Sequence, residues 1–430
     1  DLMARQDGEA RAQRKALAAF RQAGGSQLKC HCRFEALQAS FGPSDWRDWP
    51  RALRDPASPE VEHFATAHAH EVGFHAFLQW LAADGFSRAQ AAAREAGMAV
   101  GLIADLAVGA DAAGSQAWSR QGEMLHGVSI GAPPDLINVH GQDWGLAAFS
   151  PHGLICSGFR SFIDMLRSAF AHAGGLRIDH VLGLLRLWLI PHGEPPTQGG
   201  YLRYPLEDML RLLALESWRH RAIVIGEDLG TVAPGFSDRL VSHGILGMQV
   251  LWFEQDDDEA FLPANAWSHE AMATTSTHDL PTVAGWWAGR DIDWRSRLGL
   301  LGVMQSAAAE REARRRARAG LASVLGLLGS HPTTAALEAA DISASQVLDA
   351  CARHLGRTPA PLVLLPVEDA LGLEEQANLP GTFDEHPNWR RRWMADADLL
   401  LTSDKVGQRL EELQSAREAS RTVAPREPES

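Results

Sequence analysis

Cysteine is scarce in this sequence, with four among 430 residues, and tyrosine is scarcer still, with two. So few cysteines exclude a disulfide scaffold, and Cys156 and Cys351 are interpreted as buried thiols of a reduced, cytoplasmic protein. Cys30, His31 and Cys32 are the one cluster that suggests a metal. Structural zinc needs two well-separated pairs of ligands, and the second pair is missing here. The sequence therefore predicts no metal site.

Positive charge is also in deficit, since 40 Lys and Arg stand against 54 Asp and Glu, for a net charge of −14. A nucleic-acid partner needs a basic face, so this balance argues against one. No apolar run reaches the ~18 residues that a membrane span requires. Apolar residues make up 45 %, which is typical of a chain that folds around a core. The 14 Trp offer flat faces suited to stacking on sugars, although core packing explains most single ones.

Short aliphatic runs alternate with helical stretches, the pattern of parallel strands joined by crossover helices. The predicted strands are residues 99–106, 175–178, 222–225, 248–253, 272–277 and 361–367. Helical spacing of apolar residues is found in residues 61–80, 206–219 and 335–354. The Gly- and Pro-rich stretches between residues 106 and 175 are interpreted as long functional loops, and the arginine-rich run 310–318 as a solvated helix face.

These elements predict an α/β fold, a (β/α)8 barrel of the TIM type with helical and loop insertions. We assign residues 61–405 to the barrel, with insertions at about 107–173 and 288–360. Residues 1–60 form a polar, helical segment of uncertain fold, and residues 406–430 a disordered tail. A closed barrel has eight strands and only six are found. Because the two missing strands belong before residue 99, and the chain begins with Asp1, we expect the first barrel strands to be absent.

Ionisable residues directly follow four of the predicted strands. Asp179 and Glu227 come after two of them, His278 with Asp279 after a third, and residues 368–369 after a fourth. Such residues at the carboxyl ends of parallel strands are where a barrel carries its active site. For any single residue, the alternative is that it caps the next helix. Asp279 could cap a helix that begins near residue 281. Four strands with the same feature favour function.

Two opposed carboxylates suit the chemistry of a glycosidic bond, in which one is ionised and the other donates a proton. Arg177 lies two positions before Asp179, and these positions share a face of a strand, so we expect the guanidinium to keep Asp179 ionised. Glu227 follows an aliphatic strand and neighbours Asp228. Desolvation and a like charge both raise a carboxyl pKa, which suits a proton donor, although the direction in which Asp228 points stays open.

The strand-end motifs resemble the catalytic strand ends of the α-amylase clan. They are Gly175-Leu176-Arg177-Ile178-Asp179-His180, Gly226-Glu227-Asp228-Leu229-Gly230 and Ser276-Thr277-His278-Asp279. Four further stretches resemble the 4-α-glucanotransferases called amylomaltases, or disproportionating enzymes. They are Gly131-Ala132-Pro133-Pro134-Asp135, Gly141-Gln142-Asp143-Trp144-Gly145, Gly226 to Thr231, and Asn378-Leu379-Pro380-Gly381-Thr382 followed by residues 384–390. Residues 105–111 with 129–131 are similar to the bacterial maltodextrin-utilisation branch.

This resemblance implies a catalytic role for three acids. Asp179 would form the covalent glucosyl intermediate, and Glu227 would protonate the leaving sugar and then deprotonate the incoming one. Asp279 would grip hydroxyls of the distorted glucose with help from His278, and Arg177 would orient the nucleophile. Retention of configuration agrees with two displacements across a glucosyl-enzyme.

The resemblance also implies substrate-binding residues and partners. Gln142, Trp144 and Asn378 would contact the glucan, and Asp111 would lie near the non-reducing side of the bond. The family needs no metal or organic cofactor, and its substrates are maltodextrins and other α-1,4-glucans. The hypothesis is therefore a retaining 4-α-glucanotransferase. A hydrolase of the same clan, or an inactive fragment that retains the motifs, are the alternatives.

Overall fold

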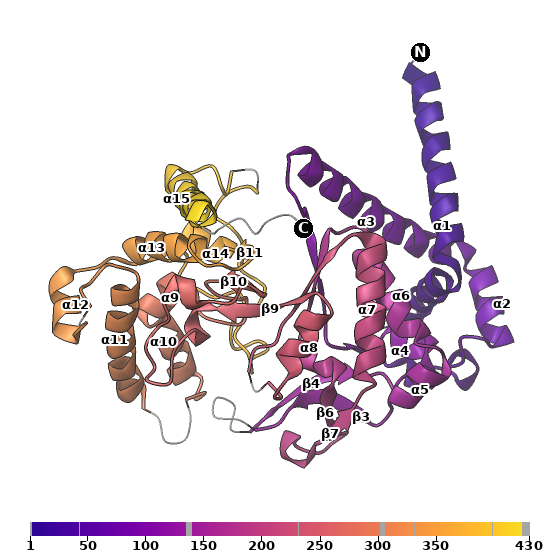
Figure 1. Cartoon of the computed structure of the whole chain (residues 1–430). Helices are drawn as coiled ribbons and strands as arrows, with labels where there is room; N and C mark the ends of the chain where they lie inside the picture. Colours follow the sequence, from indigo (N-terminus) through magenta and orange to yellow (C-terminus); the bar gives the residue numbers. More distant parts are fainter. Residues whose placement is uncertain are drawn as a thin grey trace. The chain divides into compact units, whose positions relative to one another are not determined.

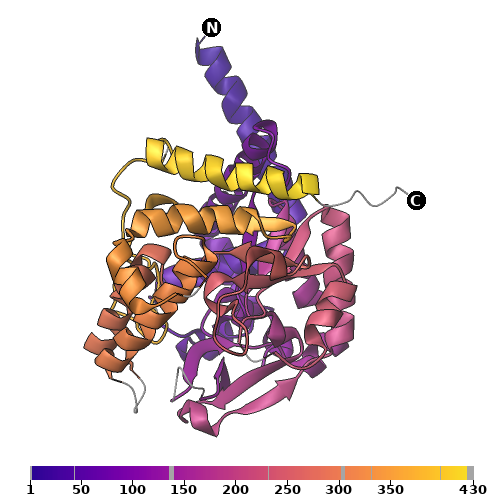
Figure 2. The ribbon, with the colours of Figure 1, turned by 60° about the vertical axis from the view of Figure 1, so that its left-hand side comes forward.

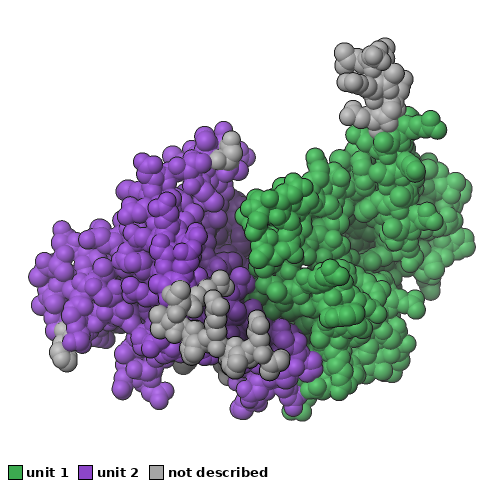
Figure 3. Space-filling model, turned by 45° about the horizontal axis from the view of Figure 1, so that its top comes forward, with its two compact units in different colours: residues 1–135, 140–227 green, residues 136–139, 228–430 purple. Residues whose placement is uncertain are grey.

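The computed structural model describes residues 2–42, 44–134, 140–230, 232–301, 306–330, 332–397 and 399–423. Contacts divide the chain into two compact units (Figure 3), the first made of Asp1–Asp135 and His140–Glu227, the second of Leu136–Val139 and Asp228–Ser430. Asp135 and Thr231, which end two of the motifs quoted above, lie outside the described residues, as does the tail beyond residue 423. Within the described residues, no helix is both long and apolar enough to cross a membrane.

Unit 1 contains a parallel sheet in the order β1-β5-β8, with β1 at Ile103–Leu106, β5 at Gly175–Ile178 and β8 at Ile223–Gly226. Helices α6 (Arg160–Phe170) and α7 (Leu206–His220) pack against each other (Figure 1). Glu207 and Asp208 lie in the first turn of α7, and Arg219 and His220 lie in its last turn. This distribution of charge is the one that the helix dipole favours. Parallel strands are covered on their faces, which is why these strands are short and mainly apolar, with Asp105 and Arg177 as the charged exceptions.

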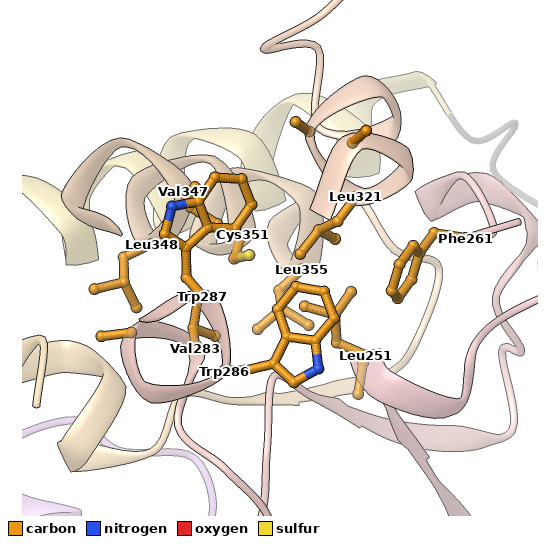
Figure 4. Packing of buried hydrophobic residues seen from close by; sticks show 14 of the residues in the cluster. Leu251, Phe261, Val283, Trp286, Trp287, Leu321, Val347, Leu348, Cys351 and Leu355 are labelled. Carbon is orange, nitrogen blue, oxygen red and sulfur yellow. The ribbon is translucent and has the colours of Figure 1, made fainter. Parts of the chain in front are cut away.

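Unit 2 contains three further parallel strands in the order β9-β10-β11, with β9 at Ile245–Val250, β10 at Ala271–Thr274 and β11 at Leu362–Leu364. Its core lies between α9 (Val283–Ala288), α11 (Ala307–Val324) and α13 (Ala344–Gly356), where Trp286 and Trp287 pack among aliphatic side chains (Figure 4). All six predicted strands thus occur and are parallel, and the α/β fold of TIM-barrel type is confirmed. The described residues before Ile103 contain helices and no strand.

The amino-terminal part is built from α1 (Leu2–Phe41), which is kinked at Gly25, the short helix α2 (Pro59–Ala67) and the long helix α3 (Ala69–Glu95). The helix predicted at 61–80 is in fact two, because the chain leaves helical geometry at His68. Cys30, His31 and Cys32 lie on α1, where residues two apart point to different sides of a helix. His31 bonds Ser115 at 3.0 Å, and burial raises the pKa of the Cys32 thiol to about 11.

The region predicted as Gly- and Pro-rich loops instead supplies three strands of a second sheet of unit 1, together with short helices, which corrects that interpretation. It is antiparallel in the order β2-β4-β3-β6-β7. The strands are β2 (Ala110–Asp111), β3 (Val128–Ala132), β4 (Gln142–Ala147), β6 (Arg186–Pro191) and β7 (Gly200–Arg203). Its glycines allow close pairing. A Cβ on Gly131 would lie 2.1 Å from the carbonyl oxygen of Gln142, at a bulge between β3 and β4. Glycine marks a close approach of backbones here, and not a loop.

Three predictions about helical segments of unit 2 are corrected by the structure. The tail expected to be disordered is helical up to Val423, as α15 (Asp404–Val423), which lies along α13 (Figure 2). Arg409 explains its order, because this side chain is 3 % exposed and bonds Asp349. In the arginine run of α11, Arg314 points inward and bonds Asp291 at 2.8 Å, so the run is only partly a solvated face. The helix predicted at 335–354 is interrupted at Asp341, whose φ is 47°.

Candidate active site

Arg177 joins two carboxylates at the ends of β1 and β5. Its guanidinium donates to both oxygens of Asp105, at 2.7 and 2.8 Å, and approaches Asp179 Oδ1 at 3.1 Å. The register of the sheet explains this, because Asp105 pairs directly with Arg177, and Asp179 lies two residues further on the same face. Asp179 is itself fixed by its backbone N–H, which donates to the carbonyl of Leu106 at 2.9 Å.

Burial and neighbouring charges shift the pKa of Arg177 in opposite directions, and its side chain is 15 % exposed. Burial lowers its pKa, but the hydrogen bonds to Asp105 and the charges of Asp105, Asp179 and Glu227 outweigh it and raise the pKa above the usual value. A permanent cation therefore lies among three acids. Sequence reasoning missed Asp105 as a site residue; its register with Arg177 was the missing signal.

Glu227 is held at the end of β8 by three backbone contacts. Its N–H donates to Ile178 at 2.9 Å, its carbonyl accepts from Val181 at 2.9 Å, and its Oε2 accepts from the N–H of His180 at 2.8 Å. The close packing requires Gly226, since a Cβ there would lie 2.9 Å from Val181. Glu227 and Asp179 thus project from the ends of neighbouring strands.

His180 is a second residue that sequence reasoning missed. It adopts a left-handed backbone conformation with φ 45° and ψ 59°, and this turn directs its N–H at Glu227. Such a conformation is uncommon outside glycine, and histidine is among the residues that tolerate it. Burial lowers the pKa of the His180 ring, so the neutral imidazole is favoured beside Asp179.

Gln142 and Trp144 lie on strand β4 and not on the long loop that was predicted. Residues two apart share one face of a strand, and the indole N–H of Trp144 donates to Gln142 Oε1 at 3.3 Å. The Trp144 ring meets the ring of His180 edge-on, with centroids 5.5 Å apart. Both predicted binding residues are therefore joined to the segment that follows Asp179.

The remaining predicted residue of unit 1, Asp111, has a different setting. It lies on β2, and its carboxylate accepts from the N–H of Ala113 at 2.9 Å, a local turn. It borders a hollow with Glu35 and Gln38 of α1.

Asp179 borders another cavity, lined mainly by apolar residues such as Ile178 and Leu187, which gives the carboxylate a low-dielectric wall.

Unit 2 carries the other group of predicted residues. Asp279 accepts from Asn378 Nδ2 at 2.6 Å and lies 3.2 Å from His278 Nε2. The backbone N–H of Asn378 in turn donates to the carbonyl of His278 at 3.0 Å. Asp279 is not a helix cap, because Thr282 caps α9 and accepts from Gly285. Three residues from distant parts of the sequence thus form one hydrogen-bonded cluster.

The acids after the fourth strand do not belong to the site, which corrects the sequence interpretation. They begin helix α14 (Val367–Leu371), and Asp369 is fully buried, with its pKa raised to about 6 by burial. Its carboxylate accepts from the hydroxyl of Thr275 and from the N–H of Val283 at 2.7 Å. It therefore holds both ends of the segment that carries His278 and Asp279.

The direction of Asp228, which the sequence left open, is settled within unit 2. Its Oδ1 accepts from the N–H of Met248 on β9 at 2.9 Å, and burial raises its pKa. Nearby, burial raises the pKa of Glu254 to about 7; the hydrogen bond from Gln249 lowers it and the charge of Asp228 raises it.

Glu254 leads to a prediction about pH. Because its folded pKa lies above the usual value of 4.5, its contribution to stability is complete below pH 4.5 and is lost as the pH rises through about 7. We therefore expect the free energy of unfolding of Glu254→Gln to exceed that of the parent chain. The difference should grow between pH 4.5 and about 7, to at most about 3 kcal/mol, and stay constant above. Urea unfolding at pH 5, 6, 7 and 8 measures this, with exposed Glu270→Gln as the control. A difference that does not change with pH would contradict it.

The described portion of the chain contains no group of three or more His, Cys, Asp or Glu placed to hold a metal ion.

The family model described as 4-alpha-glucanotransferase matches residues 2–396. The chain belongs to this family. A 4-alpha-glucanotransferase of Mycobacterium tuberculosis (strain H37Rv) is 42 % identical over 379 residues, which are 87 % of this chain and 51 % of the relative. That of Haemophilus influenzae is 32 % identical over 382 residues, 88 % and 54 % of the two chains.

Solved structures of the family show the same fold. Amylomaltase from Corynebacterium glutamicum superposes with a TM-score of 0.80 at 29 % identity, covering 94 % of this chain and 56 % of that one. Amylomaltase from Streptococcus agalactiae in complex with acarbose gives a TM-score of 0.74 at 18 % identity, with 94 % and 75 % covered. The chain spans about half the length of the curated relatives it matches.

Proposed function

We propose that this chain is a retaining 4-α-glucanotransferase, which transfers segments of α-1,4-glucans between maltodextrins. One observation carries the proposal: Asp179 and Glu227 project from neighbouring strand ends, with the Arg177 cation bonded to the first of them. Family membership supports the choice of substrate class.

In the first step Asp179 attacks the anomeric carbon of the donor, and the bond to the leaving oxygen breaks. The guanidinium of Arg177, 3.1 Å from Asp179 Oδ1, orients the carboxylate for this attack. Glu227 gives its proton to the leaving oxygen, so that the departing glucan leaves as a neutral alcohol. The product of this step is a covalent glucosyl-enzyme with inverted configuration.

In the second step Glu227 takes the proton from the hydroxyl of an acceptor glucan, which attacks the same carbon and releases Asp179. The second inversion restores the α-configuration. The N–H of His180 donates to Glu227 Oε2, and an ionised Glu227 accepts this bond more strongly than a protonated one. This bond keeps the carboxylate in place between its two tasks.

The cluster of Asp279, His278 and Asn378 suits the binding of sugar hydroxyls, since it offers charged acceptors and donors in a fixed arrangement. We assign it to the glucose that is distorted during cleavage. Trp144 and Gln142 are assigned to the glucan chain, and the apolar wall beside Asp179 helps to disfavour water as an acceptor.

Incubation with maltotriose tests the activity. We expect glucose together with longer maltodextrins, and a constant total of reducing ends, because each bond broken is replaced by another. Chromatography follows the products, and a reducing-sugar assay follows the total. A rising total would assign the chain to hydrolysis, and no turnover would contradict the proposal.

A further inference from the structure

Trp389 combines two features that are unfavourable for a large apolar residue. Its side chain is 66 % exposed, and its backbone is left-handed, with φ 58°. A bulky residue is a genuine outlier in that region, and it persists only where the surroundings enforce it. Exposure alone is not unusual, because Trp218 is 78 % exposed within the regular helix α7. The strained backbone sets Trp389 apart.

The neighbouring segment enforces this conformation. The N–H of Trp389 donates to the carbonyl of Ala377 at 3.1 Å. The side chain of Asn388 accepts from the N–H of Leu379 at 2.9 Å and donates to the carbonyl of Thr382 at 3.0 Å. The ring of His386, which is fully buried, contacts Asn388 Oδ1 at 2.6 Å. The loop is thus rigid beneath an exposed indole.

The indole borders the polar cluster of unit 2. Its ring lies 5.2 Å from that of His278, tilted by 48°. His278 contacts Asp279, and Asp279 bonds Asn378, the residue that follows Ala377. A flat apolar face therefore lies next to groups that bind hydroxyls. A glucose ring has two complementary surfaces, C–H bonds on its faces and hydroxyls at its edge. Its face can pack on the aromatic ring while its hydroxyls reach the polar groups.

We propose that Trp389 is a glucan-stacking residue, on which a glucose ring packs while its hydroxyls meet the cluster of Asp279, His278 and Asn378. The choice of a glucan as ligand rests on the proposed function. The strain at Trp389 is then retained because it presents the indole to the substrate, and a side chain that fits the left-handed turn better would lose that surface.

Binding of a maltotetraose with sulfur in its glycosidic bonds tests this on the unaltered active chain, since the ligand has the ring faces of the substrate and resists cleavage. Calorimetry compares Trp389→Ala, Trp389→Phe and the control Trp218→Ala. We expect Trp389→Ala to weaken binding about tenfold or more, Trp389→Phe to lose less than about threefold, and the control to match the parent. Thermal unfolding checks that each variant is folded.

The outcomes separate this inference from the proposed function. Equal binding by Trp389→Ala and the parent overturns the stacking role, and leaves the function intact if the parent converts maltotriose. An equal loss in Trp389→Phe also overturns it, because a second aromatic ring would then fail to replace the first. A parent that converts maltotriose but does not bind the sulfur-linked glucan overturns it as well. A parent that neither binds nor transfers overturns both.

Discussion

Asp179→Asn is expected to reduce the rate of transfer from maltotriose by at least about 10⁴-fold, since the amide cannot form the covalent intermediate. The variant should still fold, because Arg177 keeps its two bonds to Asp105 and because the N–H of residue 179 still donates to Leu106. It should also bind glucans, since the amide has nearly the size of the carboxylate. Product formation and calorimetry with maltotetraose measure the two properties separately.

The control for Asp179→Asn is Asp208→Asn, which removes an exposed acid paired with Arg211 on α7. Its rate should stay within about twofold of the parent, as expected for a surface ion pair. A transferase that remains active with Asn at position 179 would refute the assignment of the nucleophile, and loss of folding in that variant would show that the carboxylate supports the structure.

Glu227→Gln is expected to lower transfer from maltotriose by about 10²–10⁴-fold, because the leaving sugar no longer receives a proton. Glutamine retains an oxygen that accepts the N–H of His180, so the geometry should persist. A maltosyl fluoride donor needs no proton, since fluoride leaves by itself. The first step should therefore recover with that donor, while the second step, which needs a base, stays slow.

Because the first step is then fast and the second step slow, the covalent intermediate should accumulate to a detectable level. With the fluoride donor, Glu227→Gln should accumulate the glucan ester on Asp179, and mass spectrometry of the peptide that contains residue 179 should show the added maltosyl mass. The parent chain treated in the same way is the control. If the fluoride donor gives the variant no advantage over maltotriose, Glu227 is not the acid.

Local sequence patterns located the parallel strands well because their signal is local. Residues 175–178 are mainly buried, apart from the partly exposed Arg177, and form β5 with the predicted bounds. The antiparallel sheet was missed because its strands depend on partners. Gly131 and Gly200 look like loop residues until the paired strand is known.

The same reasoning applies to the candidate site. Asp179, Glu227 and Arg177 stood out by position, and their catalytic roles remain predictions. Asp105 did not stand out, because its contact with Arg177 exists only in the register of β1 and β5. Asp369 followed a strand like the others, and its structural role became clear only from its burial against Thr275 and Val283. Composition also misled at α15, where polar residues suggested disorder and ion pairs with α13 provide order.

The contacts of Asp369 have a consequence for how this chain can be shortened. Arg409 of α15 donates to the carbonyls of Asp369 and Ala370, so a helix without any predicted catalytic residue supports the carboxylate that holds both ends of the Asp279 segment. A fragment shortened before residue 404 would keep all three candidate acids yet lose this support. A change at Arg409 is therefore expected to disturb the Asp279 segment without altering any residue of that segment.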